Sequence, residues 1–321
     1  MSAVPLGTTV MKINYYEEIA RLKRDLNAVV LAHNYQKPEV QEVADYVGDS
    51  LELSIKASET KARYIVFCGV DFMAEQAAIL NEDSIVLHPD PEARCPMAAM
   101  ITPEEVLKAK KKHPKAPIVM YVNSPALVKA YSDYVVTSAN AARLVAALKE
   151  DTVIFGPDRH LAEYIAEVTG KTVIPVPANG HCPVHQRFSE EAILELKRIY
   201  GEAEVLVHPE CPRGVRRLAD YTGSTSQMIV RARRSDSRVF LVGTEVGIIY
   251  RMLRENPGKV FIPASSEAIC WDMKKITIEK VYLSLKNKVY RVVVDKEVAE
   301  RVRKAIKNTF LALGEPIPWK K

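Results

Sequence analysis

Three cysteines recur at nearly equal intervals in this chain of 321 residues: Cys95, Cys182 and Cys270 are separated by 87 and 88 positions. A thiolate is both a nucleophile and a soft metal ligand. Three thiolates at one point can hold zinc with a histidine or water as fourth ligand, or an iron-sulfur cluster with one iron that lacks a protein ligand. The spacing therefore indicates a threefold internal repeat with one metal-ligating thiol in each copy.

A simpler interpretation is that each cysteine is a small buried hydrophobic residue, which is the commonest fate of a free cysteine. Coincidence is the poorer explanation for three cysteines in register, because most other equivalent positions of the copies differ. Cys211 aligns with Ser124 and Gln36, and Cys68 has no cysteine counterpart, so we expect these two thiols to be structural. The chain has no C-x-x-C motif of the kind that structural zinc sites use, which favours a cluster whose open iron acts as a Lewis acid.

Polar side chains follow the first apolar run of each copy, where we expect a buried parallel strand to end. In register, these residues are His33, Tyr121 and His208, and two positions later Tyr35, Asn123 and Glu210. The carboxyl ends of parallel strands are where α/β folds place their chemistry. His185, three residues after Cys182, extends this set as a metal ligand or a proton-transfer group.

Hydroxyl side chains recur in three related phrases, each before a predicted helix. The phrases are Gly48-Asp49-Ser50, Val136-Thr137-Ser138 and Gly223-Ser224-Thr225. A helix N-terminus offers free backbone N–H groups that bind anions, and hydroxyls there add to the site. Helix capping alone explains any single phrase. Three phrases that face one axis favour a substrate with several anionic groups, bound by Ser50, Ser138, Ser224 and Thr225.

The elements between these residues repeat with the same period. Each copy contains an amphipathic helical stretch, an apolar run, a second helix, the hydroxyl phrase, another strand and helix, and a last strand. The predicted strands are residues 28–32, 64–67 and 84–87, then 117–121, 152–155 and 172–176, then 203–207, 239–242 and 260–262. Strands that alternate with helices predict α/β domains with parallel sheets in three layers.

The repeat predicts three homologous α/β domains, residues 14–100, 101–187 and 188–275, followed by a tail, residues 276–321, that packs back on the body. The predicted arrangement is a pseudo-threefold triangle around a central active-site cavity.

Composition excludes several classes of protein. Lysine and arginine number 45 against 40 aspartate and glutamate, and the basic residues are scattered, which argues against a nucleic-acid partner. No apolar run reaches membrane-spanning length and the N-terminus lacks an export signal, so we expect a cytoplasmic protein without a membrane partner. Five cysteines that are far apart make disulfides unlikely in such a chain.

Several stretches resemble the quinolinate synthase family, the A protein of de novo NAD biosynthesis. They are Leu31-Ala-His-Asn-Tyr-Gln36, Phe67-Cys-Gly-Val-Asp-Phe-Met-Ala74, Ala93-Arg-Cys-Pro-Met-Ala98, Cys182-Pro-Val-His185, His208-Pro-Glu-Cys211, Leu218-Ala-Asp-Tyr-Thr-Gly-Ser-Thr225 and Met273-Lys-Lys-Ile-Thr277. Together they extend over about residues 28 to 280, which is most of the chain.

The resemblance implies a triangle of three α/β domains with a [4Fe-4S] cluster on Cys95, Cys182 and Cys270. It implies a condensation of iminoaspartate with dihydroxyacetone phosphate that releases phosphate and water and gives quinolinate. It allows a transient L-aspartate oxidase or dehydrogenase partner that supplies the imine, and we expect a monomer or homodimer.

The resemblance also implies roles for residues of the pocket. Glu210, Tyr35 and His33 would move protons, while Tyr121, Asn123, His185 and His208 would orient the intermediate near the open iron. Two other interpretations remain at this stage. One is another cluster-dependent hydro-lyase, and the other is an iron-sulfur regulator or scaffold, which would need a recognition helix or a continuous basic face that the sequence does not display.

Overall fold

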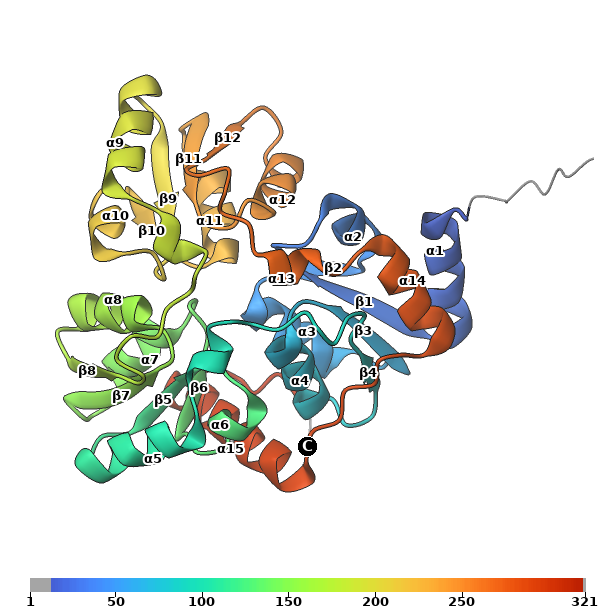
Figure 1. Ribbon diagram of the computed structural model, residues 1–321, viewed down its shortest axis with the longest axis horizontal. Coiled ribbons are helices and arrows are strands. Elements are labelled where there is room, and N and C mark those ends of the chain that lie inside the picture. Colours follow the sequence, from blue (N-terminus) through green and yellow to red (C-terminus); the bar gives the residue numbers. More distant parts are fainter. Residues whose placement is uncertain (1–12, 320–321) are drawn as a thin grey trace, which may run out of the picture.

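The computed structural model describes residues 13–319, which form three α/β units arranged as a triangle (Figure 1). Each unit contains one four-stranded parallel sheet, and the strand orders are β2-β1-β3-β4, β6-β5-β7-β8 and β10-β9-β11-β12. The three orders are the same once the strands of each unit are renumbered from its start. The predicted fold class, three homologous α/β domains around a centre, is confirmed.

The elements follow one another in the same sequence in each unit. The first unit contains α1 (Tyr15–Leu26), β1 (Ala28–His33), α2 (Pro38–Val43), β2 (Tyr46–Gly48), α3 (Ser50–Glu59), β3 (Tyr64–Cys68), α4 (Asp71–Leu80), β4 (Ile85–Leu87) and the 3-10 turn η1 (Ala98–Met100). The second contains α5 (Pro103–Lys112), β5 (Ile118–Tyr121), α6 (Ala126–Lys129), β6 (Tyr134–Val136), α7 (Ala141–Ala147), β7 (Thr152–Gly156), α8 (Arg159–Thr169), β8 (Thr172–Pro175) and η2 (His185–Arg187). The third contains α9 (Glu190–Ile199), β9 (Glu204–Val207), α10 (Arg213–Arg217), β10 (Tyr221–Thr222), α11 (Thr225–Arg234), β11 (Val239–Gly243), α12 (Ile248–Glu255), β12 (Val260–Pro263) and α13 (Trp271–Lys274).

All nine predicted strands are present, and each predicted end lies within one residue of the observed end. The prediction missed the short edge strands β2, β6 and β10, because two or three residues are too few to display a periodic pattern. The three sheets fall inside the three predicted ranges, while the boundaries at residues 100, 187 and 275 stay predictions.

The repeated Asp-Tyr phrase has a structural role in each unit. The carboxylates of Asp45, Asp133 and Asp220 each accept a hydrogen bond of 2.8 Å from a backbone N–H of the first strand of their unit. Their own backbone N–H groups donate to the carbonyl of the same strand residue. This pair of hydrogen bonds fixes the turn that leads into the edge strand and into the hydroxyl phrase that follows.

A ring of side chains joins the three units. In each unit, one long polar side chain on the helix after the first strand donates a hydrogen bond to a neighbouring unit. Gln41 Nε2 donates to the Gly247 carbonyl at 3.1 Å, Lys129 Nζ to Gln76 Oε1 at 3.1 Å, and Arg216 Nη2 to Glu167 Oε2 at 2.9 Å. Gln41, Lys129 and Arg216 occupy equivalent positions, 88 and 87 residues apart. Because each unit reaches a different neighbour, the contacts close the triangle.

The C-terminal segment contacts the first two units through two helices and one bridge. Helix α14 (Ile278–Asn287) lies against α1, with the rings of Tyr15 and Tyr282 5.5 Å apart. Arg291 then forms an antiparallel bridge with Leu87 and covers the edge of the first sheet. Helix α15 (Lys296–Ala312) packs on β6, α6 and α4 and so joins the hydrophobic cores of the first two units. None of the helices in residues 13–319 combines the length and the apolar character that crossing a bilayer requires.

Candidate active site

The carboxyl ends of the strands from all three units meet at one cavity of about 180 Å³. Thirteen of the fourteen residues that the sequence nominated line it: His33, Tyr35, Ser50, Cys95, Tyr121, Asn123, Ser138, Cys182, His185, His208, Glu210, Thr225 and Cys270. The fourteenth, Ser224, lies next to Thr225 but does not line the cavity. The threefold repeat explains this gathering, because equivalent loops of three copies face the same axis.

The three cysteines of the repeat share one environment. Each stands on the segment after the last strand of its unit, and the backbone N–H three residues later, in Ala98, His185 and Met273, acts on the thiol so as to lower its pKa. Burial raises the pKa of all three thiols, to about 11 for Cys270, and these N–H groups oppose the rise. The thiols therefore carry protons that a metal would displace on binding.

Cys68 and Cys211 lie apart from this cavity. Both are fully buried, in hydrophobic clusters formed on the sheets of the first and third units. The Cys211 thiol donates to the Gly243 carbonyl. Burial raises the pKa of both thiols, which keeps them protonated and unreactive. All five cysteines are free thiols.

Glu210 is the carboxylate at the centre of the cavity lining. Its Oε1 accepts a hydrogen bond of 2.6 Å from the Tyr121 hydroxyl, and its Oε2 lies 2.8 Å from His185 Nδ1, although the ring N–H does not point along that line. Burial alone would raise the pKa of Glu210, but His208, His185 and the Tyr121 hydroxyl together lower it. Glu210 is therefore an ionised base inside a buried site.

The remaining ring side chains of the site are uncharged. Burial lowers the pKa of His33 and of His208 to about 3, so both imidazoles are neutral at physiological pH. Burial and the nearby Glu210 charge raise the pKa of Tyr35 and of Tyr121 well above its usual value, so both phenols keep their protons. The Glu210 carboxylate thus lies among several neutral hydrogen-bonding side chains.

Thr244 connects two of these groups and was missed by the sequence analysis. Its hydroxyl lies 2.6 Å from the Tyr35 hydroxyl and 2.8 Å from His185 Nε2. The residue follows β11 directly and is 1% exposed. A threonine at this position has no counterpart in the other copies, which carry Val70 and Pro157, so the repeat gave no signal for it.

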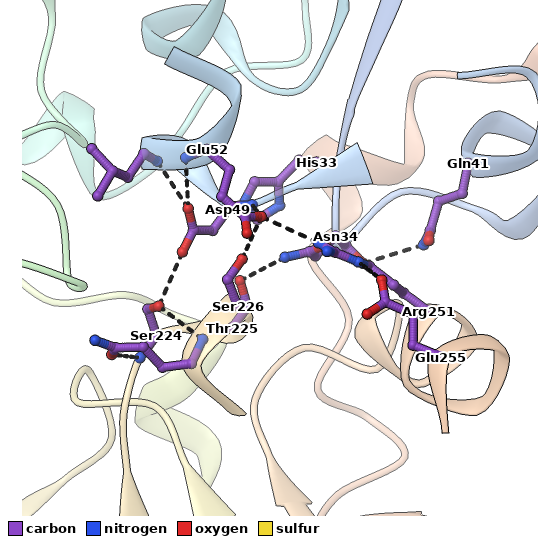
Figure 2. Close-up of polar contacts among 12 residues, drawn as sticks. His33, Asn34, Gln41, Asp49, Glu52, Ser224, Thr225, Ser226, Arg251 and Glu255 are labelled. Carbon is purple, nitrogen blue, oxygen red and sulfur yellow. Dashed lines mark hydrogen bonds and ion pairs between the residues drawn. The ribbon is translucent and has the colours of Figure 1, made fainter. Parts of the chain in front are cut away.

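The hydroxyl phrases contain both helix caps and cavity groups. Asp49 and Ser224 cap α3 and α11, and the Ser224 hydroxyl donates to Asp49 Oδ2 at 3.0 Å (Figure 2). The next residues, Ser50 and Thr225, begin the two helices and line the cavity. Ser138 differs, because it precedes α7 by three residues and lies 3.2 Å from His208 Nε2. In the third phrase capping and exposure to the cavity thus fall to neighbouring residues, whereas Asp49 both caps α3 and lines the cavity.

A hydrogen-bonded chain from outside the cavity orients Thr225. Arg251 Nη1 donates to Asn34 Oδ1 at 2.8 Å, and Asn34 Nδ2 donates to Thr225 Oγ1 at 2.8 Å (Figure 2). The arginine fixes which end of the amide faces the threonine. Because Thr225 Oγ1 accepts this bond, its own hydrogen remains available to donate into the cavity. Asn34 was not nominated from the sequence as a site residue.

Two further observations bear on ligand binding. Asn123 Oδ1 is buried without a hydrogen-bond partner among the described residues, so it offers a free acceptor in the cavity lining. Cys182, His185 and Glu210 each place one ligand atom within 4.8 Å of the others, a group able to hold a metal ion. This group is buried or half-buried at the same cavity as the other two thiols.

Comparison with known proteins agrees with the resemblance seen in the sequence. The family model "Quinolinate synthetase A protein" matches residues 17–311. The chain is 52% identical over 292 residues to a protein named quinolinate synthase from Pyrococcus furiosus, which covers 91% of this chain and 96% of the relative. It is 48% identical over 298 residues to the protein of the same name from Thermotoga maritima, covering 93% and 99%. The chain therefore belongs to the quinolinate synthetase A protein family, a family of enzymes.

Proposed function

We propose that this chain is a quinolinate synthase of NAD biosynthesis, which condenses iminoaspartate with dihydroxyacetone phosphate and releases phosphate and water. One observation carries the proposal. Three in-register thiols line the same cavity as the buried carboxylate of Glu210 and the hydroxyl groups of the repeated helix starts. A substrate with two carboxylates and a phosphate needs such hydroxyl and N–H groups, and its dehydrations need a Lewis acid and nearby proton carriers.

Cys95, Cys182 and Cys270 would hold a [4Fe-4S] cluster. The donor set fits such a group, because the three thiols come from three separate segments, are free and line one cavity. Three protein ligands leave one iron of a cubane free. A bound cluster would supply Lewis acidity toward a hydroxyl or carboxylate of the substrate.

Glu210 would serve as the principal proton acceptor. It is the ionised group, and it contacts the protonated Tyr121 hydroxyl at 2.6 Å. Tyr35 and His33, with ring centroids 4.6 Å apart, would carry protons on the other side of the intermediate. His185 and His208 stack with centroids 4.7 Å apart and would orient the substrate, His208 as a neutral ring.

The anionic groups of the substrates would lie at the helix starts. Ser50, Ser138 and Thr225 present hydroxyls to the cavity, and Asn123 offers both ends of its amide. Ser224 was also nominated for this role, but its hydroxyl already donates to Asp49. We propose that Ser224 acts through the capped start of α11 and supports Thr225 instead of reaching the substrate with its hydroxyl.

The test is an anaerobic assay with dihydroxyacetone phosphate and iminoaspartate, generated in situ by an L-aspartate oxidase or dehydrogenase. We expect quinolinate to form, together with one phosphate per product. The protein should be brown and contain about four irons per chain, as a cubane requires. A colourless, zinc-loaded protein prepared without oxygen, or the absence of quinolinate from an iron-loaded one, would contradict the proposal.

A further inference from the structure

We propose that Asp71, Asp158 and Glu245 are positioning residues that hold the three cysteine segments in place for the metal. The inference rests on the proposed function, because it concerns the residues that would bind the cluster. These carboxylates lie behind the thiols and do not replace them as ligands. Their role would be to form the site before the metal arrives.

The three acids occupy equivalent positions in the repeat. They close the phrases Gly69-Val70-Asp71, Gly156-Pro157-Asp158 and Gly243-Thr244-Glu245, which are spaced by 87 residues each. The phrases lie at the carboxyl ends of β3, β7 and β11, the second main strand of each sheet. The glycine has a spatial reason in the second unit, because a Cβ on Gly156 would lie 2.0 Å from the Val176 carbonyl oxygen.

Each acid accepts a hydrogen bond from the backbone N–H of one cluster cysteine. The distances are 3.1 Å from Cys95 to Asp71 Oδ1, 3.0 Å from Cys182 to Asp158 Oδ2 and 3.1 Å from Cys270 to Glu245 Oε1. The separations in sequence are 24, 24 and 25 residues. One contact is thus made three times, and in each unit it joins the second main strand to the segment after the last strand.

The acids are themselves fixed by the helix that follows them. Asp71 Oδ1 also accepts the Phe72 N–H at 2.9 Å, and Asp158 Oδ1 accepts the Leu161 N–H at 2.7 Å. Glu245 Oε2 accepts the Gly247 N–H at 2.7 Å, and Lys274 Nζ lies 2.8 Å from its Oε1. Asp158 and Glu245 are 0% exposed. Because these carboxylates are fixed at the end of the sheet, they hold the cysteine segments at a defined place relative to it.

The physical need for such a contact lies in the cysteine segments. Cys95, Cys182 and Cys270 follow the last strands by seven or eight residues and belong to no regular element that would hold their N–H groups. A thiol that must meet two others from distant parts of the chain gains affinity when its segment is ordered in advance. The carboxylate binds the backbone N–H of the cysteine and so fixes the point of the segment from which the thiol extends.

The test uses Asp71→Ala and Asp158→Ala in the full-length protein, reconstituted anaerobically with iron and sulfide. We expect iron and sulfide content to fall below half of the wild-type value, and loss of iron to a chelator to be about tenfold faster, as for other outer contacts of metal ligands. Asp295→Ala is the matched control. Asp295 caps α15 through one oxygen that accepts two backbone N–H groups, and it contacts no cysteine.

Asparagine substitutions separate positioning from a general need for charge. Asp71 uses a single oxygen for both of its N–H partners, so Asp71→Asn keeps every bond and should restore iron loading. Asp158 uses both oxygens, so Asp158→Asn would direct an amide N–H₂ at another N–H and should not restore it. Circular dichroism and thermal unfolding of the metal-free variants check that the fold is intact.

The outcomes distinguish this inference from the proposed function. If wild-type protein takes up no cluster, the proposed function fails. If wild-type loads normally and both alanine variants load and retain iron like Asp295→Ala, the positioning role is wrong while the cluster stands. Equal rescue by asparagine at both positions would also overturn the argument, because it predicts a difference between them.

Discussion

The cysteine segments and the strand ends line the same cavity, but they differ in how far the three copies of the repeat agree in residue type. The cysteine segments keep one residue type in all three copies, with Cys95, Cys182 and Cys270 held by acids in register. The strand ends carry different residue types at equivalent positions, so that His33 corresponds to Tyr121 and His208. A cubane presents equivalent corners to its ligands, so equal ligands suit it. A substrate condensed from two unlike molecules has no threefold symmetry, and its binding groups must differ.

The difference has an electrostatic consequence. Of the three equivalent positions Tyr35, Asn123 and Glu210, only one carries a charge, and it is the one beside the Tyr121 hydroxyl. Three carboxylates facing one axis would repel one another and raise their pKa values. Divergence of the copies therefore leaves one carboxylate at these three positions, while the three thiols stay equivalent.

The largest expected effect tests the symmetric part. Cys270→Ala removes one of three equivalent thiols, and we expect it to abolish stable iron binding and quinolinate formation. Cys211→Ala is the matched control, because Cys211 is fully buried in the same unit but lies in the hydrophobic core. Iron content per chain and the visible absorption of anaerobic protein measure both variants.

The same pair of variants can break the comparison. If Cys211→Ala lost its iron and Cys270→Ala kept it, the ligand set would be wrong. Retention of full iron by Cys270→Ala would show that the symmetric thiols do not act as one site.

The next effect tests the asymmetric part. Glu210→Gln removes the ionised carboxylate of Glu210 and keeps the size of the side chain and its contact with the Tyr121 hydroxyl. We expect kcat to fall by about 10²- to 10⁴-fold, the usual contribution of a general base, with iron content unchanged. Steady-state kinetics of the metal-loaded variant measure the loss of turnover, and substrate binding to the same variant measures any change in affinity. A kcat within about twofold of wild type would remove Glu210 from proton transfer.

A smaller effect is expected from Asn34, which orients Thr225 from outside the cavity. Asn34→Asp keeps an acceptor for Arg251 but presents an acceptor to Thr225, which would then donate to it instead of to the substrate. We expect about a tenfold loss of kcat/KM, the size of a lost hydrogen bond to a charged group. Thr225→Val in the Asn34→Asp background should add little, since both changes remove one bond. Fully additive losses would mean that Asn34 acts elsewhere.

The smallest effect on the chemistry is expected from the ring that joins the units. Lys129→Gln copies the residue found at the equivalent position 41, so iron content and turnover should stay near wild type. Burial lowers the pKa of Lys129 to about 8, whereas the unfolded chain titrates near 10.4. Between these values the unfolded state binds more protons, so the free energy of unfolding rises with pH by at most about 1.4 kcal/mol per unit from this group.

Denaturant unfolding at pH 8 and pH 10 measures this slope. The free energy of unfolding of Lys129→Gln should lack the increase with pH that Lys129 contributes to wild type. Wild type should therefore gain stability relative to the variant between pH 8 and pH 10. An unchanged difference between pH 8 and pH 10 would show that Lys129 keeps an ordinary pKa.

Much of the fold could be predicted from the sequence because each element of the repeat occurs three times at the same spacing. The nine main strands were found through apolar runs that recur with one period, whereas β10, with two residues, gave no pattern to detect. The Gly-x-acid phrase was equally periodic and would have nominated Asp158 and Glu245. Its spacing does not indicate that the acids accept hydrogen bonds from the backbone N–H groups of cysteines 24 or 25 residues away, because that contact depends on how the two segments fold together.

By itself the sequence determined that three copies of one α/β unit exist, which thiols are equivalent, and which polar residues end the strands, since each of these is a matter of order and spacing along the chain. Only the tertiary structure decided that Thr244 bridges Tyr35 and His185, that Arg251 orients Asn34, and that Ser224 caps a helix while Thr225 faces the cavity. These are contacts across units or choices between adjacent side chains. They depend on distances and directions that differ between the copies, and periodicity carries no information about them.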